Sequence, residues 1–166
     1  QAQTGRFNIQ QIGDALTSYG KNTVNQNGKT YYTVQCGHGG WQSSVVVSLS
    51  PNGDVIWMSL NLVPLPAKVS PTAMLNLLKK NSDLGPIFFS IGANWLRISS
   101  PVPNNNMSEA RLKAYVEQLV NTAVDTHDLW NSKTGEATAI FRSSSHPQKD
   151  LGPVVNAFRR LKSEGQ

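Results

Sequence analysis

The segment from Ser70 to Trp130 constrains the fold most, because it predicts a helix, a tight β-hairpin and a second helix in succession. Ser70-Pro71 is typical of a helix start, since the hydroxyl caps free backbone N–H groups and proline fits the first helical position. Asn81 is expected at the end of this helix. Its apolar stripe is predicted to be Met74, Leu75, Leu77 and Leu78.

The hairpin and the second helix follow from equally local signals. IFFSI (87–91) and WLRIS (95–99) flank the predicted turn Gly92-Ala93-Asn94, and Ser108 is expected to cap a helix that runs to about Asp128. Apolar residues recur in this helix at three- and four-residue spacing: Leu112, Tyr115, Val116, Leu119, Val120 and Ala123. Such a helix is stable only when its apolar face packs on another element, and the hairpin is the nearest candidate.

The first third of the chain predicts a helix followed by a β-meander. Asn8 is expected to cap a helix that continues to about Tyr19, after which the hydrophobic period changes from helical to two. A turn signal at 27–28 precedes predicted strands at 29–36, 43–50 and 54–62, and turn signals at 37–40 and 51–53 separate these strands. The predicted order is α-β-β-β-α-β-β-α. It indicates an α+β fold with a single twisted antiparallel sheet, helices mainly on one face, and an additional C-terminal helix.

The predicted sheet has two unlike faces, because side chains alternate along each strand. The apolar face, expected under the helices, collects Val45, Val47, Leu49, Ile56, Met58, Leu60, Leu62, Leu96 and Ile98. The opposite face is rich in serine but carries Trp57, Trp95, Arg97 and Val46. It is either a solvated face with scattered aromatics or a contact surface for a protein or peptide, where Trp and Arg are favoured anchors.

The composition changes after Asn131, so we divide the chain into an α+β domain at 8–131 and an extension at 132–166. The run ATAIF (137–141) is predicted as an edge strand or a docked loop. Asp150 is expected to cap a short amphipathic helix whose apolar face comprises Leu151, Val154, Val155, Phe158 and Leu161. That face is predicted either to dock on its own domain or to enter a partner's groove, and Val154, Val155 and Phe158 are then the binding residues.

Composition narrows the class of protein. The 166 residues are 39% hydrophobic and 15% charged, which is typical of a folded domain, and no apolar run approaches the ~20 residues that span a bilayer. The net charge of +5 is spread thinly, so weak nucleic-acid binding is only a second alternative function. The polar start at Gln1 and the low charge favour a protein exported after signal-peptide removal, periplasmic or secreted, with a cytoplasmic protein as the alternative.

Candidate catalytic chemistry is limited to Cys36 and His38, which lie two residues apart in a glycine-rich stretch. A thiol-dependent enzyme that uses this pair is the first alternative function, although no orienting partner is identifiable. The three histidines lack metal-ligand spacing, and His127 is expected in the last turn of the long helix, where the helix dipole stabilises it. We therefore predict no catalytic residue, metal or cofactor, and a non-enzymatic protein-binding role.

The segment from Leu77 to Trp130 resembles the second half of a YbjN-type domain, a family similar in architecture to type III secretion chaperones of the CesT/Tir class. The resemblance is carried by LLKKN (77–81), Phe88-Phe89, Trp95-Leu96, the Pro101–Pro103 loop and Ser108. It implies a compact, often dimeric α+β domain that binds other proteins in a chaperone-like role. It implies no cofactor and no catalytic residue.

Overall fold

The computed structural model describes residues 5–38, 40–65, 68 and 70–131. Helix α1 (Ile9–Ala15) and the 3-10 turn η1 (Thr17–Tyr19) precede four strands: β1 (Asn22–Gln26), β2 (Lys29–His38), β3 (Trp41–Leu49) and β4 (Val55–Pro64). Helix α2 (Pro71–Asn81) leads to the hairpin of β5 (Phe88–Gly92) and β6 (Trp95–Pro103), and α3 (Glu109–Asp125) and α4 (His127–Asn131) follow.

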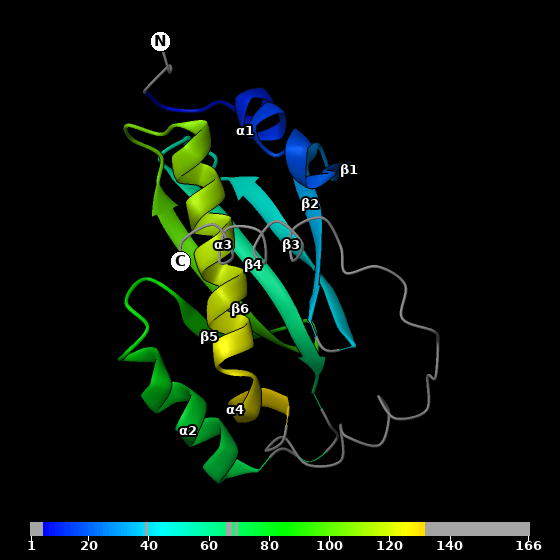
Figure 1. The fold of residues 1–166 in the computed structure, drawn as a ribbon, viewed down its shortest axis with the longest axis vertical. Helices are drawn as coiled ribbons and strands as arrows, with labels where there is room; N and C mark the ends of the chain where they lie inside the picture. Colours follow the sequence, from blue (N-terminus) through cyan, green and yellow to red (C-terminus); the bar gives the residue numbers. More distant parts are fainter. Residues whose placement is uncertain (1–4, 39, 66–67, 69, 132–166) are drawn as a thin grey trace, which may run out of the picture.

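The six strands form one antiparallel sheet in the order β1-β2-β3-β4-β6-β5. The hairpin therefore joins the meander where β6 pairs with β4. Figure 1 shows α3 crossing in front of the sheet, with α1 near one end and α2 and α4 near the other. The predicted α+β class, with a single antiparallel sheet and helices mainly on one face, is confirmed. The helix expected at 150–162 lies outside the described residues.

The core lies between α3 and the apolar face of the sheet, as the alternation of side chains along the strands predicts. Met58 and Leu60 of β4 and Ile98 of β6 are fully buried, facing the stripe of α3. The buried residues of that stripe are Leu112, Val116, Leu119, Val120 and Ala123. Burial of each large apolar side chain stabilises the fold by about 1.5–3 kcal/mol, so this contact is the main source of stability.

Several predicted boundaries are wrong. Residues 22–26 form β1, a polar strand without a clear apolar alternation, which exists because the Asn27-Gly28 turn folds it onto β2. Strand β2 continues through Gly37 to His38, which pairs with Trp41 at the start of β3. The predicted break at 37–40 therefore shortens to the two residues between them. At the later hairpin, Gly92 is the last residue of β5 rather than part of the turn.

The helices also differ from their predicted extents. The long helix ends at Asp125, and His127 begins the separate helix α4 instead of closing the last turn of α3. Thr126 separates the two helices, with its hydroxyl donating to the Thr122 carbonyl at 2.6 Å. In α2, Leu77 is buried and Met74 is half-buried, whereas the other two predicted stripe residues, Leu75 and Leu78, are exposed.

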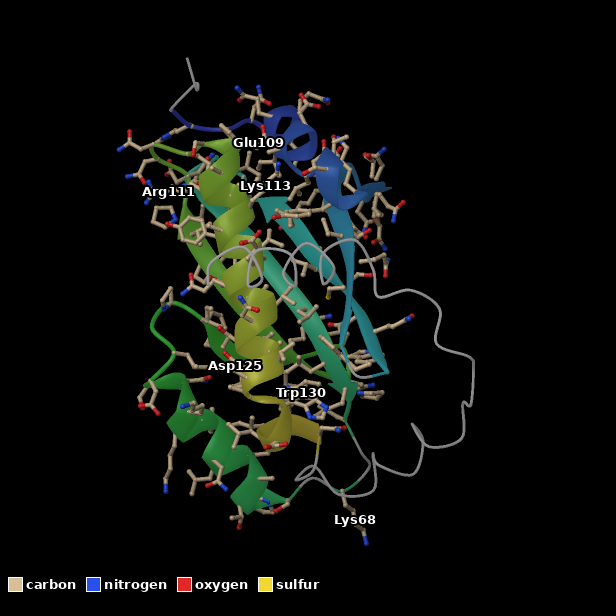
Figure 2. All side chains as sticks on the ribbon, in the orientation of Figure 1. Lys68, Glu109, Arg111, Lys113, Asp125 and Trp130 are labelled. Carbon is tan, nitrogen blue, oxygen red and sulfur yellow. The ribbon has the colours of Figure 1, made fainter. Side chains whose placement is uncertain are left out.

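Two buried indoles fasten α4 to the sheet. Trp130 of α4, labelled in Figure 2, donates its indole N–H to the Ala123 carbonyl at 2.9 Å. Its ring packs against Trp41 of β3 with 5.4 Å between the ring centroids, and Trp41 donates to the Leu62 carbonyl at 3.0 Å. Both polar N–H groups therefore have partners, which makes the burial of the two large rings favourable.

Asn104, the residue directly after β6, connects three segments of the chain by hydrogen bonds. Its side-chain oxygen accepts from the backbone N–H of Phe7 at 3.0 Å, and its amide nitrogen donates to the carbonyls of Phe7 and Gly53, both at 2.8 Å. The Asn104 side chain is buried, so water could not take over its hydrogen bonds to these backbone groups if the side chain were removed. Asn104 thus holds the N-terminal arm and the β3–β4 turn against the β6–α3 connection.

We predict that Asn104→Ala lowers the free energy of unfolding by about 3 kcal/mol, because it leaves buried backbone groups without partners. The measurement is urea unfolding followed by circular dichroism. Asn105→Ala is the matched control, because Asn105 is exposed, and it should change the free energy by less than about 0.5 kcal/mol. Equal effects of the two substitutions would contradict the role given to Asn104.

Candidate protein-binding surface

The candidate surface is the sheet face opposite the helices, which we call the open face. One row across it runs from Thr33 through Val46, Ser59 and Ser99 to Phe88. The strands that carry this row are hydrogen-bonded on both sides from β2 to β6, so the backbone beneath the surface is rigid. Small side chains predominate in the row, and larger neighbours can therefore project from it.

Trp57 is the most exposed of the predicted binding residues that the structure describes. It lies on the central strand β4 between Ser48 of β3 and Pro101 of β6, and 43% of its surface is exposed. Val46 is the diagonal neighbour of Trp57, because Val46 lies opposite Ser59, and its side chain is half-buried. The two side chains form an apolar site with Pro101 and two serines, Ser48 and Ser59, beside it.

Arg97 lies farther along the same face and is held flat against the sheet. Its Nε donates to Oδ1 of Asn61 at 2.8 Å. The guanidinium extends over Gly92 of the neighbouring strand β5, where an added Cβ would lie 2.6 Å from Nη1. Gly92 has no positive φ, so the backbone conformation does not require glycine here. Glycine is needed because its missing Cβ leaves room for the Arg97 guanidinium.

Trp57 and Trp95 share the open face but do not form one site. Trp57 lies opposite Pro101, and Trp95 is six residues earlier on the same strand, opposite Pro64 and Gly92. At ~3.3 Å per residue, about 20 Å separates the two positions. The structure therefore divides the predicted residues into Trp57 with Val46 at one end and Trp95 with Arg97 at the other.

The remaining predicted binding residues, Val154, Val155 and Phe158, lie outside the described residues. Two further features were not predicted as exposed: the pair Leu75 and Leu78 on α2, and Ile91 on β5. Helical spacing assigned the leucines to the core stripe, although only one side of a short helix reaches the core. Sequence alone has no signal that distinguishes Leu77 from its neighbours here.

Cys36 lies on the helix-covered face of β2 and is buried. Burial raises the pKa of its thiol from 9.0 to about 12, and backbone hydrogen bonds with Val45 and Ser43 of β3 only partly offset that effect. The Sγ atom donates to the Ser43 carbonyl at 3.4 Å. A neutral, enclosed thiol is a poor nucleophile, so these contacts disfavour the thiol-enzyme alternative. The side chain of His38 lies outside the described part of the structure.

No other chemical centre is apparent within the described ranges. These residues contain no group of three or more His, Cys, Asp or Glu side chains that could hold a metal ion. His127 packs edge-on against Trp130, with 4.7 Å between the ring centroids. Among the described helices, none combines the length and apolar character needed to cross a membrane.

Comparison with known proteins leaves the family open. No family model and no curated protein matches this chain. One similar solved structure is the heterodimeric ExoU-SpcU complex from the type III secretion system of Pseudomonas aeruginosa. The match has 16% sequence identity and a TM-score of 0.49, and covers 70% of this chain and 94% of that chain. A similarity at this level does not assign a family, so the resemblance to YbjN-type domains stays a prediction.

We predict that native Cys36 reacts with iodoacetamide at pH 7.5 about 10³-fold more slowly than the same residue in urea-unfolded chain. The reason is that a thiol pKa of about 12 instead of 9.0 lowers the thiolate fraction by this factor. Mass spectrometry of quenched samples measures the rate. Rapid labelling of the native protein would contradict the buried, neutral thiol and restore the enzyme alternative.

The contact of Arg97 with Gly92 leads to a further prediction. Gly92→Ala should lower the free energy of unfolding by about 1 kcal/mol, because the new methyl group displaces the guanidinium and breaks its hydrogen bond to Asn61. In an Arg97→Ala background the same substitution should be nearly neutral, which a double-mutant cycle by urea unfolding measures. An equal cost in both backgrounds would show that Gly92 acts through the backbone instead.

Proposed function

We propose that this chain is a non-enzymatic, chaperone-like domain that binds a segment of another protein through the open face of its sheet. The observation that carries the proposal is Trp57, a large aromatic residue that is 43% exposed on a central, doubly paired strand. Tryptophan is a favoured hot-spot residue because it buries a large area with few rotatable bonds. A rigid strand lowers the entropy cost of binding further.

The geometry of the face defines the segment that it would bind. Arg97 is four residues from Pro101, the strand partner of Trp57, so the backbone positions of Arg97 and Pro101 lie about 13 Å apart along β6. The guanidinium extends from there over Gly92, which pairs with Trp95, six residues from Pro101. An extended peptide advances by the same ~3.3 Å per residue. We therefore propose a ligand with an apolar side chain on Trp57 and Val46 and a carboxylate about four to six residues away, at the Arg97 guanidinium.

The sequence resemblance to YbjN-type domains supports a role in holding another protein rather than changing it chemically. Enclosure of Cys36 in the core supports the same class. A second copy of this chain is the alternative partner for the open face. Light scattering of the purified protein distinguishes a homodimer from a monomer.

We predict that the wild-type protein selects, from phage-displayed random 12-residue peptides, sequences with an apolar residue four to six positions from an Asp or Glu. Trp57→Ser should weaken binding of the selected synthetic peptides about 30-fold, a hot-spot effect of about 2 kcal/mol. Fluorescence anisotropy of labelled peptides measures the affinity.

Leu78→Ser is the matched control for this experiment, since it also removes an exposed large apolar side chain but lies on helix α2. It should leave peptide affinity unchanged. Equal binding by wild type and Trp57→Ser, or no selection above background, would exclude the open face as the binding surface.

A further inference from the structure

A second apolar surface lies on the other side of the molecule, on α2 and β5. It consists of Leu75, Leu78 and Ile91, which are 50%, 61% and 56% exposed, and we call it the α2–β5 patch. Each of these side chains is more exposed than Trp57. Leu75 and Leu78 are three residues apart in the helix and are therefore neighbours on its surface.

Asn81 fixes α2 against the edge of β5 and brings the patch together. Its side-chain oxygen accepts from the Phe89 backbone N–H at 2.6 Å, and its amide nitrogen donates to the Phe89 carbonyl at 3.1 Å. Helix α2 and strand β5 contact each other and run in opposite directions (Figure 1). Leu78 lies about one helical turn before Asn81, and Ile91 lies two residues after Phe89. Because the helix and the strand run in opposite directions, Leu78 and Ile91 are both displaced from the Asn81–Phe89 contact in the same direction and by similar lengths.

The chain leaves the described structure close to this patch. Helix α4 ends at Asn131 and packs against α2. Residues 132–149 separate it from the segment 150–162, whose apolar residues recur at helical spacing. Eighteen residues are long enough to reach the patch, since a random coil of that length has a root-mean-square span of roughly 25 Å and α2 is only ~16 Å long. A tether of this length would hold the segment at a millimolar effective concentration around the patch.

We propose that residues 150–162 dock on the α2–β5 patch of their own chain, with Val154, Val155 and Phe158 as the contact residues. The apolar face of the segment and the exposed leucines then cover each other. This inference is independent of the proposed function, because the open face lies on the opposite side of the sheet. It assigns the C-terminal apolar residues to the chain's own domain instead of a partner's groove.

Charge selects an antiparallel orientation to α2. Lys79 and Lys80 lie in the last turn of that helix, and Asp150 begins the C-terminal segment. An antiparallel arrangement places Asp150, which follows Lys149, near Lys79 and Lys80, of which Lys80 also pairs with Asp83 at 3.5 Å. It keeps the basic residues at 159–162 away from these lysines. Val154 is then the apolar residue that lies beside Leu78.

Disulfide trapping tests this placement in the full chain. Leu78→Cys with Val154→Cys should form an intramolecular disulfide in glutathione buffer with an effective concentration at least about tenfold above that of Trp57→Cys with Val154→Cys. Native Cys36 is buried and serves as the internal unreactive thiol. Preferential trapping at position 57, a disulfide between two chains, or no preference would each overturn the proposal.

Hydrogen exchange provides a second measurement without introduced cysteines. Phe158→Asp should accelerate amide exchange in residues 71–81 at least about threefold, because the patch loses its cover. Ser163→Asp adds the same charge outside the apolar face and should have no effect. In a Leu78→Asp background, Phe158→Asp should cause no further acceleration. Unchanged exchange in the Phe158→Asp protein would overturn the proposal.

Discussion

The rest of the structure depends on the burial of the α3 stripe against β4 and β6. Leu112, Val116 and Leu119 are fully buried there, and they face strands that come from separate parts of the sequence. The meander contributes β4 and the later hairpin contributes β6, so one helix covers the joint between them. Because apolar burial is the dominant favourable term in folding, this contact also decides that the two pieces form a single sheet.

Two buried or partly buried asparagines complete what apolar burial cannot specify. Asn104 pairs with backbone groups of the N-terminal arm and the β3–β4 turn, while Asn81 pairs with both polar groups of Phe89 at the sheet edge. The apolar contacts are non-directional, whereas these hydrogen bonds have defined geometry. They determine where the arm and α2 lie, and thereby which surfaces remain uncovered.

Within the described ranges, the open face and the α2–β5 patch differ in a way that matters for function. The open face carries Trp57 and Arg97 on paired strands with small polar neighbours, which suits a specific, partly polar ligand. The α2–β5 patch is more strongly apolar and lies near the end of α4. Our proposals therefore assign the open face to another protein and the patch to the C-terminal segment of the same chain.

Most helices and strands, the antiparallel class and the two-faced sheet could be predicted from sequence, because hydrophobic period, caps and turn residues are local properties. The sequence correctly placed Val45, Met58 and Ile98 in the core and Trp57 on the opposite face. It failed for β1, whose polar residues pair only because a neighbouring strand is present, and for Leu75 and Leu78, whose exposure depends on which side of α2 meets the sheet. The separation of Trp57 from Trp95 and the enclosure of Cys36 were decided by tertiary structure alone, since strand register and helix cover involve residues far apart in the chain.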